Sequence, residues 1–124
     1  MSEIYETGSL GERLLTEYLT RRGHTVSPSG RKTFDLIVDG RYADVKTSRA
    51  PYARLGFVGL TDAQHAALLA GEDFSVFVVC NAQDPSAPEV LEFTSSQLRG
   101  ETPTAATTYY WYRSQLERIR SEGA

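Results

Sequence analysis

The sequence is poor in cysteine and has no long hydrophobic segment. Cys80 is the only cysteine among 124 residues, so no intramolecular disulfide can form and a reducing compartment is expected. Apolar runs such as residues 76–80 are far shorter than a membrane-spanning helix requires. The first six residues have neither a basic start nor an apolar stretch, so no export signal is expected. These absences favour a cytoplasmic protein with no membrane partner.

The chain also lacks a strong excess of charge. Its net charge is −3, and its 40% hydrophobic and 23% charged residues are typical of one globular domain, here residues 1–124. Basic residues outnumber acidic ones by nine to seven in residues 1–54, whereas acidic residues outnumber basic ones by nine to four in the remainder. The first half would therefore suit a polyanion. An ordinary solvated surface explains the same asymmetry.

Hydrophobic periodicity and turn residues predict alternating helices and strands. The expected helices cover residues 10–22, 61–70, 95–99 and a segment starting at a capping box at 114–117. The expected strands cover residues 25–27, the hairpin 34–46, a buried central strand 74–80, and 90–93 and 109–112. The expected connections are a long mobile segment at residues 49–60 and loops at 81–88 and 101–108. This order predicts an α/β fold, a three-layer sandwich with a central mixed β-sheet flanked by helices.

The hairpin carries the most informative residues. Asp39-Gly40 is a strong signal for a tight type I′ turn, because both central residues of that turn need positive φ. The resulting register places Asp35 opposite Asp44, with Lys46 two residues further along the same face. The residues expected on the opposite, inward-packing face are apolar: Phe34, Leu36, Val38, Ala43 and Val45. The polar face is expected to line a surface or cleft.

Two carboxylates in cross-strand positions repel each other, because their Cβ atoms lie about 5 Å apart. A cation is therefore expected beside Asp35 and Asp44, and Mg²⁺ suits such a site because it takes oxygen ligands from carboxylates, water and phosphate. Glu12 has two interpretations. It completes a capping box that starts at Ser9, and it also lies at the border of the apolar stripe, from which it would reach inward.

These residues resemble the PD-(D/E)XK, or restriction-endonuclease-like, nuclease superfamily over residues 8–80. Within it, residues 8–12, 34–35 and 43–48 look most like small prokaryotic endonuclease domains, including those of the NO VEIN C-terminal type. The resemblance implies an αβββαβ core and a magnesium-dependent endonuclease acting on DNA, with Mn²⁺ as a substitute metal. It also implies that Asp35, Asp44 and the Val45 carbonyl bind the metal, that Lys46 positions or deprotonates the attacking water, and that Glu12 supports the metal.

The sequence departs from the superfamily pattern in two places. Phe34 stands where the motif has proline, and Asp44 takes the less frequent aspartate option. Phosphate contacts around the site are expected from polar and basic neighbours: Arg31, Lys32, Thr47, Ser48, Arg49 and Arg54. The segment 109–112 would stack on bases, or would alternate between core and surface as an ordinary strand.

Two other functions remain compatible with the sequence. The first is a catalytically inactive module that keeps the nuclease fold and binds nucleic acid or a partner protein. The second is a structural or regulatory protein whose acidic residues hold no metal. For the nuclease, a homodimer or a partner protein is expected to supply specificity, because the chain has no separate recognition domain.

Overall fold

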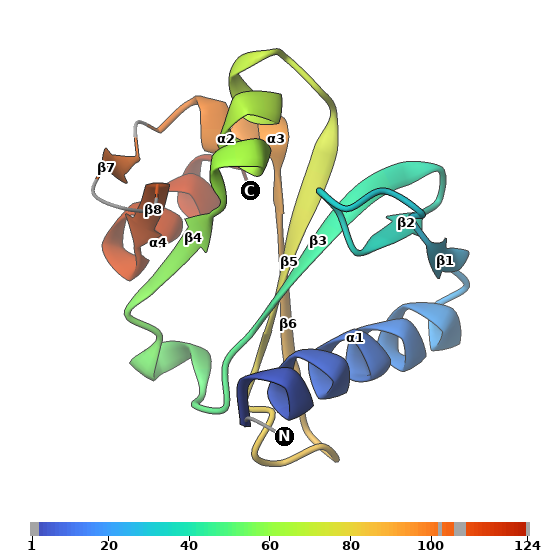
Figure 1. Ribbon diagram of the computed structural model, residues 1–124. Coiled ribbons are helices and arrows are strands. Elements are labelled where there is room, and N and C mark those ends of the chain that lie inside the picture. Colours follow the sequence, from blue (N-terminus) through green and yellow to red (C-terminus); the bar gives the residue numbers. More distant parts are fainter. Residues whose placement is uncertain (1–2, 102, 106–108, 124) are drawn as a thin grey trace.

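The computed structural model describes residues 3–101, 103–105 and 109–123. Four helices and eight strands follow one another along the described chain (Figure 1). The helices are α1 (Glu3–Arg21), α2 (Asp62–Leu69), α3 (Ser95–Arg99) and α4 (Arg113–Gly123), and a 3₁₀ turn covers Tyr52–Arg54. The strands are β1 (Val26–Pro28), β2 (Leu36–Val38), β3 (Arg41–Thr47), β4 (Phe57–Leu60), β5 (Phe74–Cys80), β6 (Glu89–Thr94), β7 (Thr104–Ala105) and β8 (Tyr109–Tyr112).

A mixed five-stranded sheet forms the middle layer, in the order β1-β2-β3-β5-β6. Strands β1, β2 and β3 form an antiparallel meander, β3 pairs with β5 in parallel, and β5 pairs with β6 in antiparallel fashion. All seven residues of β5 are buried, which confirms the prediction of a central strand covered on both faces. The α/β fold with helices flanking a mixed sheet is therefore as the sequence predicts.

Each face of this sheet has its own hydrophobic core. Helix α1, blue in Figure 1, lies along one face of the sheet, and its leucines belong to the core on that face. This core contains Leu14, Leu15, Leu19, Leu36, Val38, Ala43, Phe77, Val79 and Ala82. The other face packs against α2, α3, α4 and a second sheet of order β4-β8-β7, in a core that includes Leu60, Leu68, Val76, Val78, Phe93, Trp111 and Leu116.

Helix α1 begins earlier than its hydrophobic pattern indicates. It starts at Glu3 rather than near residue 10, so Ser9 lies inside the helix and the capping box predicted there is wrong. The C-terminal end is as predicted, because Gly23 takes φ of +88° and the amide of His24 donates to the Leu19 carbonyl. Among the described helices, none is long and apolar enough to cross a membrane.

The segment predicted as a long mobile connection, residues 49–60, contains ordered secondary structure. It holds the 3₁₀ turn and strand β4, which pairs with β8 in the register Phe57↔Tyr112 and Val58↔Trp111. The prediction was wrong because the partner strand lies about fifty residues later, and Gly56 and Gly59 mask the strand pattern. The expected loop 101–108 likewise contains β7, while residues 102 and 106–108 lie outside the described chain.

The helix starts show how capping residues act in this fold. The predicted capping box at Thr61 and Gln64 is present at the start of α2, and both reciprocal hydrogen bonds form. Helix α4 starts one residue before the predicted box at Ser114. Ser114 therefore lies inside the helix and the capping box predicted there is wrong; instead, the Gln115 side chain accepts a hydrogen bond from the amide of Tyr112 at 2.9 Å.

Candidate functional site

The β2–β3 hairpin has the predicted turn and register. Asp39 and Gly40 take φ of +50° and +84°, as a type I′ turn requires. Leu36 pairs with Ala43 and Val38 with Arg41, so Asp35 and Asp44 are brought together where β2 begins. The Asp39 side chain also accepts hydrogen bonds from the Thr25 amide and from the His24 ring. These two bonds lower the pKa of Asp39 and fasten the turn to the loop after α1.

Asp35 lies immediately before β2 and is exposed. Its amide donates to the Ala43 carbonyl at 3.0 Å, and its Oδ2 accepts from the Val45 amide at 2.9 Å. The Asp35 carboxylate therefore extends the hydrogen bonding between β2 and β3 beyond the first residue of β2. This contact holds the Asp35 side chain over β3, beside Asp44.

Asp44 is the buried acid of the site, with only 4% of the residue exposed. Its Oδ2 lies 2.8 Å from the Lys46 Nζ, and within the described chain that oxygen accepts no hydrogen bond of normal geometry. Burial raises the pKa of Asp44 to about 6; the ammonium of Lys46 opposes the shift, and Asp35 adds to it. Lys46 compensates only part of the cost of keeping this carboxylate charged.

Glu12 reaches the two aspartates from α1. Its pKa is raised, first by burial and then by the charge of Asp35, a hydrogen bond to Asp35 and the charge of Asp44. The close approach of α1 to β3 makes this possible, because a Cβ placed on Gly11 would lie only 1.8 Å from Thr47 Oγ1. Of the two interpretations of Glu12, the structure therefore supports the one in which it reaches inward.

The two faces of the hairpin differ from the prediction in one respect. Leu36, Val38, Ala43 and Val45 pack toward α1 as expected, but Phe34 packs in the opposite core, stacked on Tyr42 and Phe74. Alternation fails at Phe34 because it lies outside β2. The polar face also does not simply line a surface, because α2 and the second sheet cover it and bury Asp44.

Gln64 is a site residue that the sequence interpretation assigned only to a helix cap. It is 4% exposed, and its Oε1 accepts from both the Thr61 amide at 3.1 Å and the Lys46 Nζ at 3.2 Å. Its Nε2 donates to the Thr33 carbonyl at 3.0 Å. In the sequence, Gln64 is recognisable only as the third residue of the helix that starts after Thr61. Because the capping box explains a glutamine at that position, the sequence gives no reason to place Gln64 beside Lys46.

The residues expected to contact phosphate are in different situations. Arg31 forms a two-fold ion pair with Glu72 and lies over the rings of Phe34 and Tyr42, so its guanidinium is engaged within the fold. Thr47 packs against α1, with a buried hydroxyl. The Ser48 hydroxyl donates to the Ala50 carbonyl.

The remaining three candidates lie at the surface. Lys32, Arg49 and Arg54 are exposed. Lys32 lies closest to the carboxylates, because it lines a shallow depression of about 380 Å³ together with Glu12, Ser29, Arg31 and Asp35. Of the six predicted phosphate contacts, Arg31 and Lys32 therefore lie beside the acidic residues, and Arg31 is paired with Glu72.

The acidic residues fit a hard cation with few protein ligands. No group of three or more His, Cys, Asp and Glu side chains in the described chain has the spacing to enclose a metal ion. Mg²⁺ does not need such a cage, since it keeps several waters and typically takes one or two carboxylates plus phosphate oxygens. Asp35 and Asp44, with a buried oxygen that lacks a hydrogen bond, supply that donor set.

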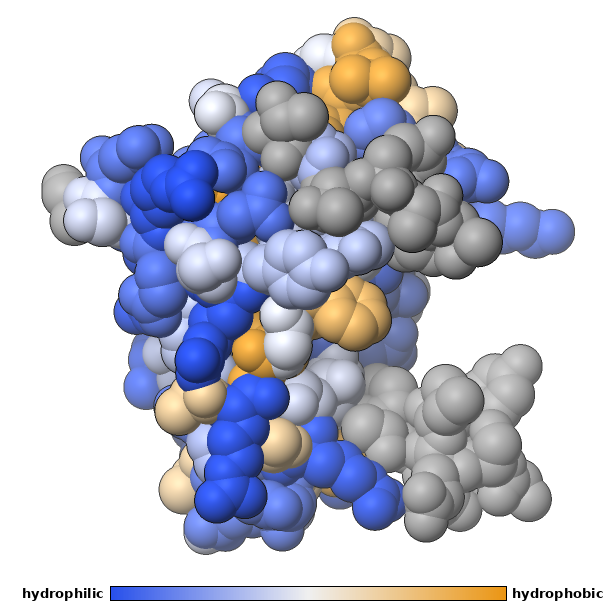
Figure 2. All heavy atoms as spheres, turned by 90° about the vertical axis from the view of Figure 1, so that its left-hand side faces the viewer, coloured by the Kyte–Doolittle hydropathy of each residue, from blue (hydrophilic) through white to orange (hydrophobic). Residues whose placement is uncertain are grey.

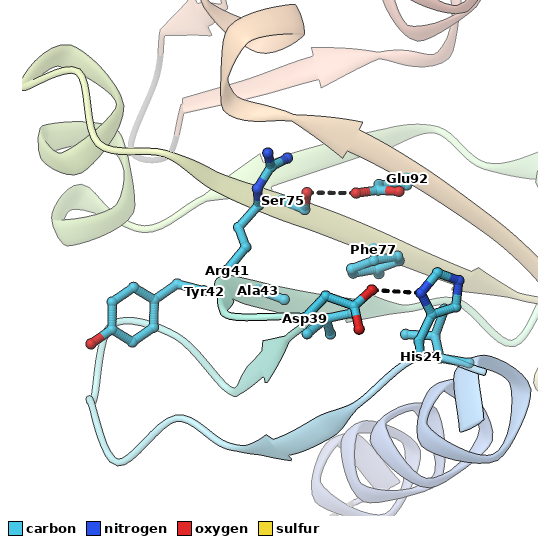
Figure 3. A pocket seen from close by; sticks show the side chains of 10 residues that line it. His24, Asp39, Arg41, Tyr42, Ala43, Ser75, Phe77 and Glu92 are labelled. Carbon is cyan, nitrogen blue, oxygen red and sulfur yellow. Dashed lines mark hydrogen bonds and ion pairs between the residues drawn. The ribbon is translucent and has the colours of Figure 1, made fainter. Parts of the chain in front are cut away.

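A second cavity lies near the turn of the hairpin, on the α1 side of the sheet (Figure 3). It measures about 270 Å³, and Phe77 forms part of its apolar wall. Its polar side chains bond to one another: His24 Nδ1 lies 2.6 Å from Asp39 Oδ2, and the Ser75 hydroxyl donates to Glu92 Oε2 at 2.6 Å (Figure 3). Asp35, Asp44 and Lys46 do not line this cavity, so it is separate from the candidate metal site.

The geometry of Glu12, Asp35, Asp44, Lys46 and Gln64 thus defines the candidate site. Comparison of the chain with family models, with curated proteins and with solved structures found no match.

Proposed function

We propose that the chain is a magnesium-dependent endonuclease that hydrolyses phosphodiester bonds of DNA in the cytoplasm. The proposal depends on one observation above all, the convergence of Asp35, Asp44 and Lys46 at the open end of the hairpin. The resemblance to PD-(D/E)XK nucleases supports it. The order α1, the β1–β2–β3 meander, α2 and the parallel strand β5 contains the expected αβββαβ succession, with β4 inserted before α2.

The charge balance of the cluster favours a bound cation. Glu12, Asp35 and Asp44 bring three carboxylates near one ammonium group, and the pKa values of Glu12 and Asp44 are raised by burial first and then by neighbouring carboxylates. Asp35 and Asp44 would hold Mg²⁺, with Glu12 in support. When bound, the ion would act as a Lewis acid on a phosphate oxygen and lower the pKa of a water molecule.

Lys46 has the geometry to orient a water or a phosphate oxygen. An ammonium group has three N–H donors. The Lys46 Nζ donates one hydrogen bond, to Gln64 Oε1 at 3.2 Å, and forms an ion pair with Asp44 Oδ2 at 2.8 Å that lacks hydrogen-bond geometry. Because the Lys46 side chain is 28% exposed, at least one further N–H donor is available to a group that enters from solvent. Gln64 holds the ammonium group because its own amide is fixed at Thr33.

The direct test is cleavage of plasmid, branched and single-stranded DNA in Mg²⁺ or Mn²⁺, compared with EDTA. Wild-type protein is expected to cut in a metal-dependent way, and Lys46→Ala and Asp44→Asn to lose that activity. Arg22→Ala removes an exposed positive charge at the far end of α1 and serves as the control with unchanged cutting. Asp44→Asn keeps the test interpretable, because it is expected to fold even if Lys46→Ala leaves Asp44 without a counter-ion.

An alternative is a catalytically inactive module of the same fold, which binds nucleic acid or a partner protein. An ion pair between Lys46 and the buried Asp44, with Gln64 bonded to the lysine, is compatible with a purely structural role. Metal-independent DNA binding without cutting, equal in wild type and Lys46→Ala, would favour this alternative over the nuclease.

A further inference from the structure

Strands β4 and β8 present aromatic side chains away from the core. Val58 and Trp111 point inward and are 4% and 0% exposed. Because side chains alternate along a strand, the neighbouring residues of this antiparallel pair point outward. Phe57 and Tyr112 are directly opposed in the register and are 56% and 47% exposed, which makes them two of the most exposed large hydrophobic residues described.

Tyr110 joins these two residues into one surface, which we call the aromatic platform: Phe57, Tyr110 and Tyr112. The ring of Tyr110 lies 5.3 Å from that of Phe57 and 5.1 Å from that of Tyr112, measured between centroids. The hydroxyls of the two tyrosines lie 3.2 Å apart. Across the strand, Tyr110 pairs with Gly59, which has no side chain to cover it. The three rings therefore contact one another, with Phe57 and Tyr112 exposed and Tyr110 half-buried between them.

The sequence segments that form the platform carry positive and no negative charge; in space, the Glu101 carboxylate lies near Gln115 and is paired with Arg118 at 2.7 Å. Residues 49–61 and 109–116 include Arg49, Arg54 and Arg113 and no acidic residue, although the whole chain has a net charge of −3. The amide of Arg113 donates to the Gly56 carbonyl at 3.2 Å, which fixes this arginine at the end of the platform. Figure 2 shows the side of the molecule that bears β4 and β8, where hydrophobic colour is confined to separate spots among hydrophilic residues.

We propose that the aromatic platform binds single-stranded DNA by stacking its bases on the exposed rings. Exposed aromatic faces stack on any base, and arginines beside them neutralise the phosphate backbone. This inference extends the proposed function, because it assigns the site a single-stranded segment of substrate. Strand β4 leads directly into α2 and Gln64, so the platform lies at most about 25 Å from the residue that holds Lys46. About seven stacked nucleotides span that distance.

The test measures binding without chemistry. Fluorescence anisotropy of a labelled 16-nucleotide oligo(dT) in EDTA gives the affinity of the wild type and the variants. Phe57→Ala and Tyr112→Ala are each expected to weaken binding at least about fivefold, because a base–aromatic stack contributes at least that factor. Tyr112→Phe keeps the ring and is expected to bind as the wild type does. Leu69→Ala removes an apolar side chain of α2 that is even more exposed, at 71%, and is the matched control.

Other outcomes would overturn the inference. Equal affinities for all variants would show that the platform does not contact the strand. A concentration-dependent dimer in sedimentation, dissociated by Tyr112→Ala, would assign the platform to a second copy of the chain. The result is separable from the proposed activity: weakened binding with no cutting in Mg²⁺ would retain the platform and reject the nuclease. Metal-dependent cutting by the wild type, with unchanged DNA binding by Phe57→Ala and Tyr112→Ala, would retain the nuclease and reject the platform.

Discussion

Asp44→Asn removes a buried charge with almost no change in side-chain volume, and we expect it to stabilise the protein. The pKa of Asp44 is about 6 in the folded protein, against an ordinary value of 3.8. A difference of roughly two units corresponds to about 3 kcal/mol at a pH above both values. The ionised carboxylate therefore costs the folded state about that much at neutral pH, even with Lys46 beside it. For a chain of this length, the gain corresponds to a rise of roughly 10 °C in Tm.

The sign of the pH dependence follows from the raised pKa. The folded protein holds the Asp44 proton more tightly than the unfolded chain does, so wild-type stability falls as the pH rises from about 4 to about 6. Asp44→Asn lacks this contribution. The difference in unfolding free energy between variant and wild type should therefore be small at pH 4, increase up to about pH 6 and stay constant above it.

Urea denaturation in EDTA measures this difference directly. Trp111 is the only tryptophan and is fully buried, so its fluorescence reports global unfolding. Asp73→Asn is the matched control, because the Asp73 side chain is 71% exposed and its removal should change stability by less than about 0.5 kcal/mol. Addition of Mg²⁺ should then stabilise the wild type and not Asp44→Asn.

Two results would refute this reasoning. A variant less stable than the wild type at pH 7.5 would mean that the ion pair with Lys46 outweighs the burial of the Asp44 carboxylate. Equal Mg²⁺ shifts in wild type and Asp44→Asn would place the ion elsewhere on the protein.

Three further predictions concern the support of the site. Gly11→Ala should destabilise the fold by about 1–3 kcal/mol in thermal denaturation, because its Cβ would meet Thr47 Oγ1; the double variant with Thr47→Ala should recover part of the loss. Gln64→Leu should slow cleavage while leaving the Mg²⁺ affinity unchanged in calorimetric titration, since Gln64 contacts Lys46 and not the carboxylates. The Mg²⁺ affinity itself should fall about tenfold per pH unit below pH 6, as Asp44 takes up its proton; a flat profile would contradict this.

The hairpin and the central strand were predictable because their signals are local. Asp39-Gly40 specifies the turn by its backbone requirement, and the period of two then sets which residues face each other. The register places Asp35 beside Asp44 without any information from distant parts of the chain. For the same reason, the capping box at Thr61 was predicted correctly.

The missed features depend on contacts between residues far apart in the sequence. Strand β4 forms only because β8 pairs with it, and its glycines favour a loop when the segment is considered alone. Phe34 leaves the expected face because β2 begins only at Leu36, and the stacking partners Tyr42 and Phe74 then determine its side. The role of Gln64 at Lys46 depends on how α2 packs over the hairpin, which no local pattern specifies.

The combination of groups at the site favours a function over a purely structural ion pair. A structural pair needs one carboxylate for Lys46, and Asp44 at 2.8 Å already supplies it. Burial first, and then the negative charge of Asp35, raises the pKa values of Glu12 and Asp44, so the additional carboxylates lower the stability of the ionised cluster. Gly11 lets α1 approach β3 closely enough for Glu12 to reach the two aspartates, although a glycine inside a helix lowers the helix propensity. An arrangement that accumulates acidic groups around a single lysine becomes favourable when a divalent cation and a phosphate complete it.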